Sequence, residues 1–376
     1  MRNTKRLDVS IDGIKVGDLA MMPDHRAAFQ YSPVWLRNGF SISPFSLPLD
    51  TEVHIPANMN CSGLFGVFED SLPDAWGRLL VDRALGKRGI RPDSLNVLDR
   101  LAIVGENGIG DLEYRPAEHF EEEIGTALSL DEIQEQCSRV LKSEDAENLD
   151  TLFRLGGSTG GTRPKIYLSL EGKEWMIKFQ TRHDIPDSGL MEYRYAQCAV
   201  KCGIPMSRTR LFPSDTCRGY FGSERFDRKG GLKEHIVTVK GLLELAFDQP
   251  SLDYSSLLRM TDILTCHSEE QILQMFRIAC FNVFSHNQDD HSKNFSFLYD
   301  KKKRVWKLAP AYDLTFSTTA YNEHTTSVNY NGRNPGKKEF LEIASENGIL
   351  KAKAAEIIDQ IHDFVKADLN EYVNDL

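Results

Sequence analysis

Long hydrophobic runs are absent from this sequence of 376 residues. A membrane-spanning helix needs about 18 or more consecutive apolar residues, and no such stretch occurs. The first residues, MRNTKRLDVS, also lack the apolar segment of a signal peptide. We therefore expect a cytoplasmic protein without a membrane segment.

Cysteine is sparse and is not arranged in the pairs that bind zinc. The chain has 7 cysteines, and the closest two, Cys198 and Cys202, do not form a CxxC motif. Disulfide frameworks and structural zinc sites both need recurring pairs at short spacing. Reduced, buried thiols are the interpretation that fits this pattern.

Positive charge is in the minority, with 45 Lys and Arg against 55 Asp and Glu and a net charge of −10. A broad surface for non-specific binding of nucleic acid needs clustered cations, so we do not expect one, although a local basic patch is compatible with these numbers. The hydrophobic share of 41% is that of an ordinary globular protein. The length predicts two domains, or one domain with a sizeable appendage.

The first hundred residues carry local patterns for both strands and helices. Residues 6–20 alternate apolar and polar around Asp12 and Gly13, which predicts a hairpin. A helix is expected from the break at Asp74 to about residue 85, with Asp74 as a candidate cap.

Glycines follow at positions 105, 108 and 110, but their spacing does not match GxGxxG. We expect them to shape a turn rather than to hold a phosphate. The acidic stretch 117–150 contains an amphipathic pattern at 130–142, which predicts a helix in a connecting segment.

A second glycine-rich stretch, RLGGSTGGTRPK, occupies residues 154–165 and runs into strand patterns at 165–170 and 174–179. Such a loop can lay backbone N–H groups against phosphate oxygens, because glycine lets the backbone approach closely. It does not match the GxxxxGK(S/T) motif, so a flexible surface loop is the competing interpretation.

Lys178 lies among the apolar residues of WMIKF. A lysine that faces inward from a buried strand needs an anion. In a kinase-type fold this lysine contacts the nucleotide phosphates and pairs with a glutamate of the next helix, for which Glu192 is the candidate. A solvated strand lysine is the alternative, and the sequence does not decide between the two.

A further strand pair is predicted within residues 207–228. In a kinase, the segment after the last strand of the N-terminal lobe contacts adenine through its backbone. We place this hinge at Glu224, Arg225 and Phe226.

The most polar motif of the chain, NQDDHSKNFSFL, spans residues 287–298. Upstream of it, apolar residues recur at the helical period, so a core helix is expected to end at about His286. Downstream, two strand patterns with a turn at 300–303 lead to Asp313. The predicted order is therefore helix, polar loop, hairpin and aspartate.

This order suggests phosphoryl transfer. Asp289 and Asn294 are five residues apart, the spacing of the DxxxxN catalytic loop of kinases. Asp289 would orient an attacking hydroxyl or accept its proton, and Asn294 and Asp313 would supply oxygens to Mg²⁺ on the phosphates of ATP. His291 and Lys293 are candidates for contacts with phosphate or substrate, or for holding the loop.

Two other interpretations compete with this one. A solvated loop that caps a helix is common, but it leaves the ordered set of Lys178, Asp289, Asn294 and Asp313 unexplained. A metallohydrolase is a stronger rival, because His286, Asp289, Asp290 and His291 could ligate a metal. That rival assigns no role to Lys178 or to the glycine-rich loop.

Together these motifs make the sequence similar to the HipA family, serine/threonine kinases that are toxins of bacterial toxin–antitoxin pairs. The matching elements are STGGTRPK, WMIKF, SERFDR, NQDDHSKNFSFL and APAYDLTFS, with FEDSLPDAWGRLL and LAIVGENGIGDLEY in the N-terminal part. The resemblance covers nearly the whole chain. It implies an α+β, bilobed protein-kinase-like fold with an appended N-terminal α/β subdomain and a largely helical C-terminal lobe.

The expected domains are an N-terminal subdomain at 1–116, a helical connector at 117–150, a kinase N-lobe at 151–228 and a C-lobe at 229–376. The resemblance also implies ATP and Mg²⁺ as cofactors, a catalytic base at Asp289, and metal ligands at Asn294 and Asp313. The implied nucleotide contacts and their neighbours are Ser158, Gly160, Gly161, Thr162, Lys165, Lys178, Glu192, Glu224, Arg225, Phe226, His291, Lys293 and Tyr312. Ser158 is the implied site of autophosphorylation, with Thr159 and Thr162 as alternatives. One departure from ordinary protein kinases is His291, which stands where those enzymes carry a lysine.

The partners implied by the resemblance are a small DNA-binding antitoxin like HipB and a protein substrate of translation, aminoacyl-tRNA synthetases among them. DNA would be reached only through the antitoxin, since the chain shows no helix-turn-helix pattern of its own. Two alternatives stay open beside an active kinase toxin. One is a kinase-like binding module that acts mainly with the antitoxin in operon repression, and the other is a small-molecule phosphotransferase.

Overall fold

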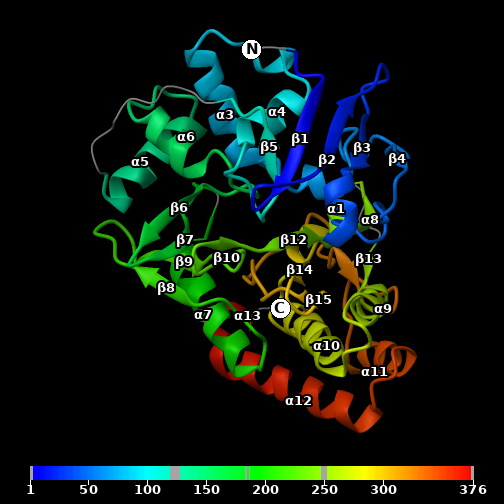
Figure 1. Cartoon of the computed structure of the whole chain (residues 1–376). Helices are drawn as coiled ribbons and strands as arrows, with labels where there is room; N and C mark the ends of the chain where they lie inside the picture. Colours follow the sequence, from blue (N-terminus) through cyan, green and yellow to red (C-terminus); the bar gives the residue numbers. More distant parts are fainter. Residues whose placement is uncertain (1–2, 119–127, 183, 186, 247–251, 374–376) are drawn as a thin grey trace. The chain divides into compact units, whose positions relative to one another are not determined.

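The computed structural model describes residues 3–118, 128–182, 184–185, 187–246 and 252–373 (Figure 1). The chain forms two compact units. The first consists of Met1–Pro186 and Phe212–Ala246, and the second of Asp187–Leu211 and Phe247–Leu376. Part of the acidic stretch expected as a connector, residues 119–127, lies outside the described residues. The domain boundaries expected from the sequence stay predictions.

The first unit begins with an antiparallel sheet in the order β4-β3-β2-β1-β5. The predicted hairpin at 6–20 is confirmed, since Ile11 lies opposite Ile14. Asp12 and Gly13 between them have φ angles of 50° and 76°, as the tight turn of a hairpin requires. The strands are β1 (Arg6–Ile11), β2 (Ile14–Met21), β3 (Ala27–Tyr31), β4 (Val53–His54) and β5 (Glu113–Arg115).

Helices of this unit lie between the strands of that sheet and after its last strand in the chain. The helix predicted at 130–142 is confirmed as α5, whose first turn is closed by a capping box between Ser129 and Glu132. The helices are α1 (Pro33–Asn38), α2 (Gly66–Glu69), α3 (Ala75–Lys87), α4 (Val97–Val104), α5 (Leu130–Leu141), α6 (Leu149–Gly156) and α8 (Val239–Leu243), with a short 3-10 turn at Pro92–Ser94.

The helix α3 begins directly after Asp74, as expected, but the predicted cap is wrong. The carboxylate of Asp74 accepts no hydrogen bond from the first turn of α3. Instead it accepts the backbone N–H of Gly161, at 2.8 Å. A long-range acceptor therefore takes the place of the local cap that the sequence suggested.

A second antiparallel sheet contains the predicted pair of strands at 165–170 and 174–179. These strands are β6 (Lys165–Leu170) and β7 (Lys173–Lys178), and β7 also pairs with β9 (Tyr220–Glu224). Short strands follow as β10 (Arg228–Lys229), β11 (Leu232–Lys233) and β12 (His235–Thr238).

One buried apolar cluster joins this second sheet to three helices. Trp76 and Leu80 come from α3, Ile133 from α5 and Leu152 from α6, and they pack against buried side chains of β6 and β7 such as Ile166 and Ile177. The indole N–H of Trp76 also donates to the carbonyl of Lys165, at 3.0 Å. The strand end at Lys165 is thus fixed to α3 by both apolar packing and a buried hydrogen bond.

A single carboxylate attaches α5 to the segment that leads into β9. Asp131 accepts from the hydroxyls of Ser214 at 2.6 Å, Thr216 at 3.1 Å and Tyr220 at 2.7 Å. It also accepts the backbone N–H of Asp215, at 2.9 Å. These donors, with the Ser214 hydroxyl first, lower the pKa of Asp131 to about 2.

We expect Asp131→Asn to lower the Tm at neutral pH, because the amide cannot accept all of these hydrogen bonds. The folded pKa lies below the ordinary 3.8, so the contribution of Asp131 is complete above that pH and is lost as the pH falls towards 2. The Tm difference between wild type and variant should therefore shrink in acid. Thermal unfolding of both proteins at neutral pH and at about pH 3 measures this, with the exposed Glu135→Gln of the same helix as control. A difference that grows in acid would contradict the assignment.

The second unit is mainly helical, and its long helix α10 packs against α9 and α12 (Figure 1). Its helices are α7 (Ser188–Lys201), α9 (Tyr254–Leu264), α10 (Glu269–Phe284), α11 (Lys337–Glu346), α12 (Lys351–Asp368) and α13 (Asn370–Val373). Its strands are β13 (Leu252–Asp253), β14 (Ser296–Asp300), β15 (Val305–Leu308) and β16 (Thr326–Ser327). The strand β8 (Thr209–Phe212) pairs with β9 in the second sheet, and its last residue, Phe212, is the first of the segment Phe212–Ala246.

The predicted core helix is confirmed as α10, but it is not buried on one face alone. The continuous run from Ile278 to Asn282 is buried, so this stretch of the helix is enclosed on every side. The predicted hairpin after the polar loop is also confirmed, because β14 pairs antiparallel with β15. Among the described residues, no helix is long and apolar enough to cross a membrane.

Candidate active site

The polar motif of the sequence forms a loop that leaves the C-terminal end of α10. The helix ends at Phe284, and His286 adopts a φ of 56°, which turns the chain sharply. A short 3-10 turn, Ser292–Asn294, follows and leads into β14. The side chain of His291 accepts the backbone N–H of Lys293 and so caps this turn.

Asp289 projects its carboxylate from a loop whose backbone is fixed on both sides. Its N–H donates to the hydroxyl of Ser317 at 3.0 Å, and its carbonyl accepts from the Asn294 side chain at 2.7 Å. The side chain itself is 64% exposed, and one of its oxygens lies 3.9 Å from Nε2 of His291. An acid–base group must reach a substrate from a fixed position, and Asp289 meets both conditions.

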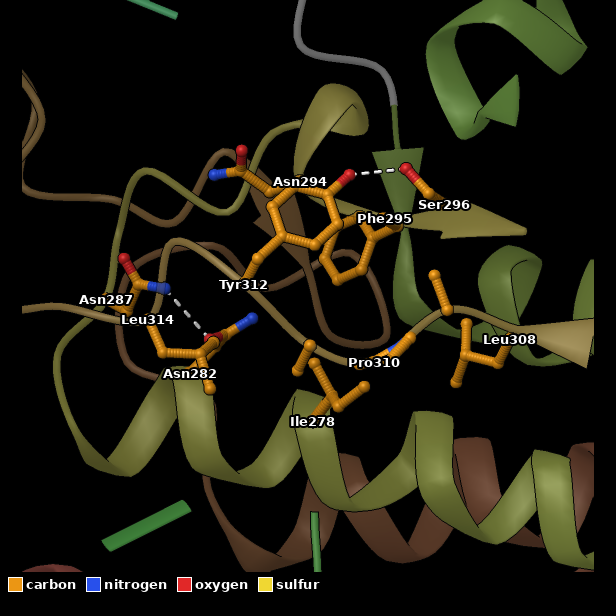
Figure 2. Close-up of a pocket in the computed structure, with 12 residues that line it drawn as sticks. Ile278, Asn282, Asn287, Asn294, Phe295, Ser296, Leu308, Pro310, Tyr312 and Leu314 are labelled. Carbon is orange, nitrogen blue, oxygen red and sulfur yellow. Dashed lines mark hydrogen bonds between the residues drawn. The ribbon is translucent and has the colours of Figure 1, made fainter. Parts of the chain in front are cut away.

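Asn294 and Asp313 are held by neighbouring parts of the same unit. Tyr312 donates its hydroxyl to the carbonyl of Lys293 at 2.7 Å and shares a hydrogen bond with Ser296 (Figure 2). The segment that carries Asp313 is thereby tied to the turn that carries Asn294. Because the side-chain amide of Asn294 donates an N–H to the carbonyl of Asp289, its oxygen is left as an acceptor.

Asp313 itself adopts a φ of 53°, which an aspartate tolerates better than most residues. Its carbonyl accepts from the side chain of Asn287 at 3.3 Å, and the same amide of Asn287 donates to Asn282 of α10 at 3.0 Å (Figure 2). Ser317 in turn donates to Asn287 at 2.9 Å. The backbone that presents Asp313 is therefore anchored to the helix below it.

The neighbouring aspartate, Asp290, has an opposite environment. It is fully buried and accepts from the hydroxyl of Tyr254 at 2.7 Å, the backbone N–H of Thr326 at 3.0 Å, and the Nδ1 side of His324 at 3.2 Å. These contacts tie the loop to the start of α9 and to β16. Asp290 is thus a structural anchor and not an exposed ligand.

The four ligands proposed for a metallohydrolase are not brought together in this structure. Of these, Asp290 is committed to the buried network described above. His286 stacks on Phe316 with ring centroids 5.3 Å apart, and burial lowers its pKa. In the described part of the chain, no three His, Cys, Asp or Glu side chains gather closely enough to hold a metal ion.

Two lysines face each other at one end of the second sheet, in the first unit. Lys165 of β6 lies opposite Lys178 of β7, and their residues are only 5% and 7% exposed. Directly opposed residues project to the same face of a sheet. The ammonium group of Lys178 lies 5.7 Å from the ring centroid of Phe221. Of the two interpretations that the sequence left open for Lys178, burial excludes the solvated strand lysine, and two adjacent buried lysines suit an anion.

The glycine-rich loop precedes β6 and is shorter than the sequence indicated. Residues 154–156, expected in the loop, form the last turn of α6 instead. Of the possible phosphate acceptors, Thr159 is fully buried and donates its hydroxyl to the carbonyl of Gly156 at 2.6 Å. Ser158 is partly exposed and Thr162 is exposed.

The residues expected as the hinge lie at the end of β9 and directly after it. Glu224 accepts from the ammonium of Lys173 at 2.6 Å. The guanidinium of Arg225 lies 3.8 Å from the ring centroid of Tyr167, and its backbone N–H donates to the carbonyl of Glu174 at 2.8 Å. The N–H of Arg225 is therefore committed to the sheet, and a backbone contact with adenine would have to come from a neighbour such as Phe226.

Glu192 lies in the first turns of α7 and is 2% exposed. It belongs to the second unit, whereas Lys178 belongs to the first. Their pairing stays a prediction.

Family models match both parts of the chain. The HipA-like C-terminal domain matches residues 157–368, and the HipA N-terminal domain matches residues 7–115. This chain belongs to the HipA family. A curated relative from Sinorhizobium fredii, named "Putative kinase Y4mE", is 26% identical over 344 residues, which cover 84% of this chain and 78% of that protein.

One solved structure shares the fold. HipA from Shewanella oneidensis, in a toxin–antitoxin complex of HipA, HipB and operator DNA, matches 98% of this chain and 91% of its own at a TM-score of 0.72 and 17% identity. The kinase CtkA of Helicobacter pylori covers 56% of this chain at a TM-score of 0.37 and 14% identity, a likeness too low to support an inference. The chain therefore has the HipA fold, with mixed α and β content.

Some side chains that shape this HipA-family site were not singled out from the sequence. Asp227 accepts hydrogen bonds from Nε and Nη2 of Arg225, at 2.9 and 2.7 Å, and from the N–H of Gly110, at 2.9 Å. Arg228 donates to the carbonyls of Gly108 and Gly110, both at 2.8 Å. The motif SERFDR thus binds the glycine turn of the N-terminal domain. In the sequence, an acidic residue between two arginines was the feature that could have indicated this contact.

Proposed function

We propose that this chain is an ATP- and Mg²⁺-dependent serine/threonine protein kinase that acts as the toxin of a toxin–antitoxin pair. The observation that carries the proposal is the environment of Asp289. Its carboxylate is 64% exposed, while its backbone is held by Ser317 and Asn294. Phosphoryl transfer depends mainly on positioning and on charge neutralisation, and a rigidly presented carboxylate serves the first of these.

The donor set near this carboxylate fits Mg²⁺. The amide oxygen of Asn294 and the carboxylate of Asp313 are hard oxygen ligands of the kind that this ion prefers. The Asn294 amide is oriented by its bond to the loop, and the Asp313 backbone is anchored by Asn287. When bound there with ATP, Mg²⁺ would neutralise charge on the β- and γ-phosphates.

Other residues of the chain would position the substrate, the loop and the nucleotide. Asp289 would orient the substrate hydroxyl and accept its proton. His291 caps the turn that carries Asn294, so holding the loop is the role its contacts support. Lys165 and Lys178 would contact phosphates from the first unit, and Glu192 would pair with Lys178. The segment Glu224, Arg225 and Phe226 would hold the adenine.

The toxin role rests on family membership and on the structural relative. The HipA of Shewanella oneidensis is part of a complex with HipB and operator DNA. By analogy, we propose a small antitoxin like HipB as the partner of this chain, with DNA reached through that antitoxin. A protein of translation, such as an aminoacyl-tRNA synthetase, is the proposed substrate, and the proposed location is the cytoplasm.

A labelling experiment separates this proposal from its alternatives. The purified chain would be incubated with γ-labelled ATP and Mg²⁺, together with either a cell lysate or its small-molecule fraction. A labelled protein band supports the protein kinase. Label only in small molecules would indicate a phosphotransferase, and no transfer to any acceptor would favour a binding module.

Autophosphorylation should occur at Ser158. This serine is partly exposed, whereas the Thr159 hydroxyl is buried and committed to Gly156, which argues against Thr159 as the acceptor. A phosphate adds a charge of about −1.5 to −2 next to the proposed phosphate contacts, so the modified loop should repel ATP. Mass spectrometry of wild type and of Asp289→Asn measures the modification.

The expected result is phosphate on Ser158 in wild type alone, and strongly reduced activity in Ser158→Asp. The exposed Thr162 is the matched control, and Thr162→Ala should leave the modification unchanged. Modification of Thr162 instead, or full activity of Ser158→Asp, would refute the prediction.

A further inference from the structure

The first turn of α3, in the part of the chain that matches the HipA N-terminal domain, contacts the glycine-rich loop. The N–H of Gly161 donates to Oδ2 of Asp74 at 2.8 Å. The carbonyl of Gly161 accepts the backbone N–H of Trp76 at 3.3 Å. Both backbone polar groups of Gly161 are thus bound by residues at the start of one helix.

The backbones of loop and helix are also in close contact. A Cβ atom on Gly77 would lie 2.6 Å from the carbonyl oxygen of Thr159, so only glycine fits at that position of α3. A Cβ atom on Gly160 would lie 3.3 Å from Oδ2 of Asp74. The Asp74 carboxylate therefore lies directly against the peptide units of Gly160 and Gly161.

The conformation of the loop at this point depends on outside support. Gly161 adopts a φ of 84°, which glycine enters readily and also leaves readily. With glycine at both 160 and 161, the loop has little local preference for one conformation. A charged acceptor such as Asp74 forms a stronger hydrogen bond than a neutral one, and it can select one conformation.

We propose that Asp74 is a positioning residue that preorganises the glycine-rich loop for nucleotide phosphates. The inference rests on the proposed function, in which this loop contacts ATP. Asp74 binds the N–H of Gly161, while the N–H groups of Gly160 and Thr162 on either side find no protein acceptor in the described part of the chain. Those two groups remain available to phosphate oxygens, and Asp74 fixes the peptide between them.

The contact makes the N-terminal HipA domain part of the nucleotide site without a contact to the nucleotide. Trp76, two residues after Asp74, also holds the carbonyl of Lys165 at the other end of the loop. The start of α3 therefore fixes both the middle of the loop and the strand end behind it. A change in this domain would reach ATP binding through Asp74.

The test compares Asp74→Ala with Asp74→Asn, whose side-chain oxygen can still accept the Gly161 N–H. The matched control is Asp82→Ala, which removes a carboxylate from the same helix that binds Arg100 and not the loop. Hydrogen exchange of the 158–164 peptide, measured without nucleotide, should be about 10-fold faster in Asp74→Ala, faster by a smaller factor in Asp74→Asn, and near wild type in Asp82→Ala. Titration with ATP and Mg²⁺ should show affinity about 10-fold weaker in Asp74→Ala, less weakened in Asp74→Asn and unchanged in Asp82→Ala, with turnover at saturating ATP within about twofold of wild type.

Unchanged exchange in Asp74→Ala would overturn the contact. Faster exchange with equal or tighter ATP binding would overturn the positioning role, because the carboxylate would then compete with phosphate for the loop. If the wild-type protein binds no ATP, the proposed function fails and this inference fails with it. If wild type binds ATP and Asp74→Ala binds it equally well, only this inference fails.

Discussion

Asp289→Asn should reduce phosphoryl transfer by about 100- to 10,000-fold, the range for loss of a general base. The amide keeps the size of the side chain but cannot accept the proton of an attacking hydroxyl. Because the carboxylate is 64% exposed and the backbone bonds of Asp289 do not involve it, the Tm should not change. Initial rates with γ-labelled ATP, together with thermal unfolding, measure both quantities.

A matched control is available on α12 of the same unit. Asp359 has a similar exposure of 61% and pairs with Lys337 on the surface. Asp359→Asn should keep wild-type activity and a near wild-type Tm. If Asp289→Asn transfers phosphate at the wild-type rate, the base is another residue. If its Tm falls sharply, the loss of activity reflects folding rather than chemistry.

Asp313→Asn should raise the Mg²⁺ concentration needed for half-maximal activity by ~10- to 100-fold, because it removes the charge of a proposed metal ligand. Asparagine is the right replacement because Asp313 has a φ of 53°, which asparagine tolerates and alanine does not. Asn294→Ala should act in the same direction, but it also removes the bond to the Asp289 carbonyl and is the less clean variant.

Isothermal titration of ATP at several Mg²⁺ concentrations measures this effect apart from turnover. Asp300→Ala, at the turn of the β14–β15 hairpin, controls for local damage and should leave the metal dependence unchanged. Identical Mg²⁺ dependence in wild type, Asp313→Asn and Asn294→Ala would exclude the proposed metal site.

Local sequence patterns were sufficient for several elements of the fold. The hairpin around Asp12 and Gly13, the hairpin of β6 and β7, and the helix α10 before the polar loop follow from alternation, turn residues and helical period. These features depend on residues close together in the chain, so the sequence predicts them directly. The DxxxxN spacing likewise marked the loop of Asp289 before any contact was known.

The tertiary structure decided how individual side chains within those elements are used. Asp289 and Asp290 are identical neighbours, yet one is exposed and the other is fully buried. The difference arises because Tyr254 and Thr326, each 36 residues away, surround Asp290 with hydrogen-bond donors. The spacing of residues within the loop gives no information about hydrogen-bond donors so far away in the chain.

The same reason explains the interpretation that changed in the N-terminal part. The sequence places Asp74 at a helix start, where a local cap is the usual role, but the acceptor serves Gly161, 87 residues further along. In the SERFDR motif, Asp227 and Arg228 likewise bind partners far away in the chain, Gly110 at 117 residues and Gly108 at 120 residues. The sequence by itself determined the elements and the chemical groups of this protein. Packing between distant segments decided which groups are buried as anchors and which are presented to a ligand, because burial and hydrogen-bond partners are long-range properties of the fold.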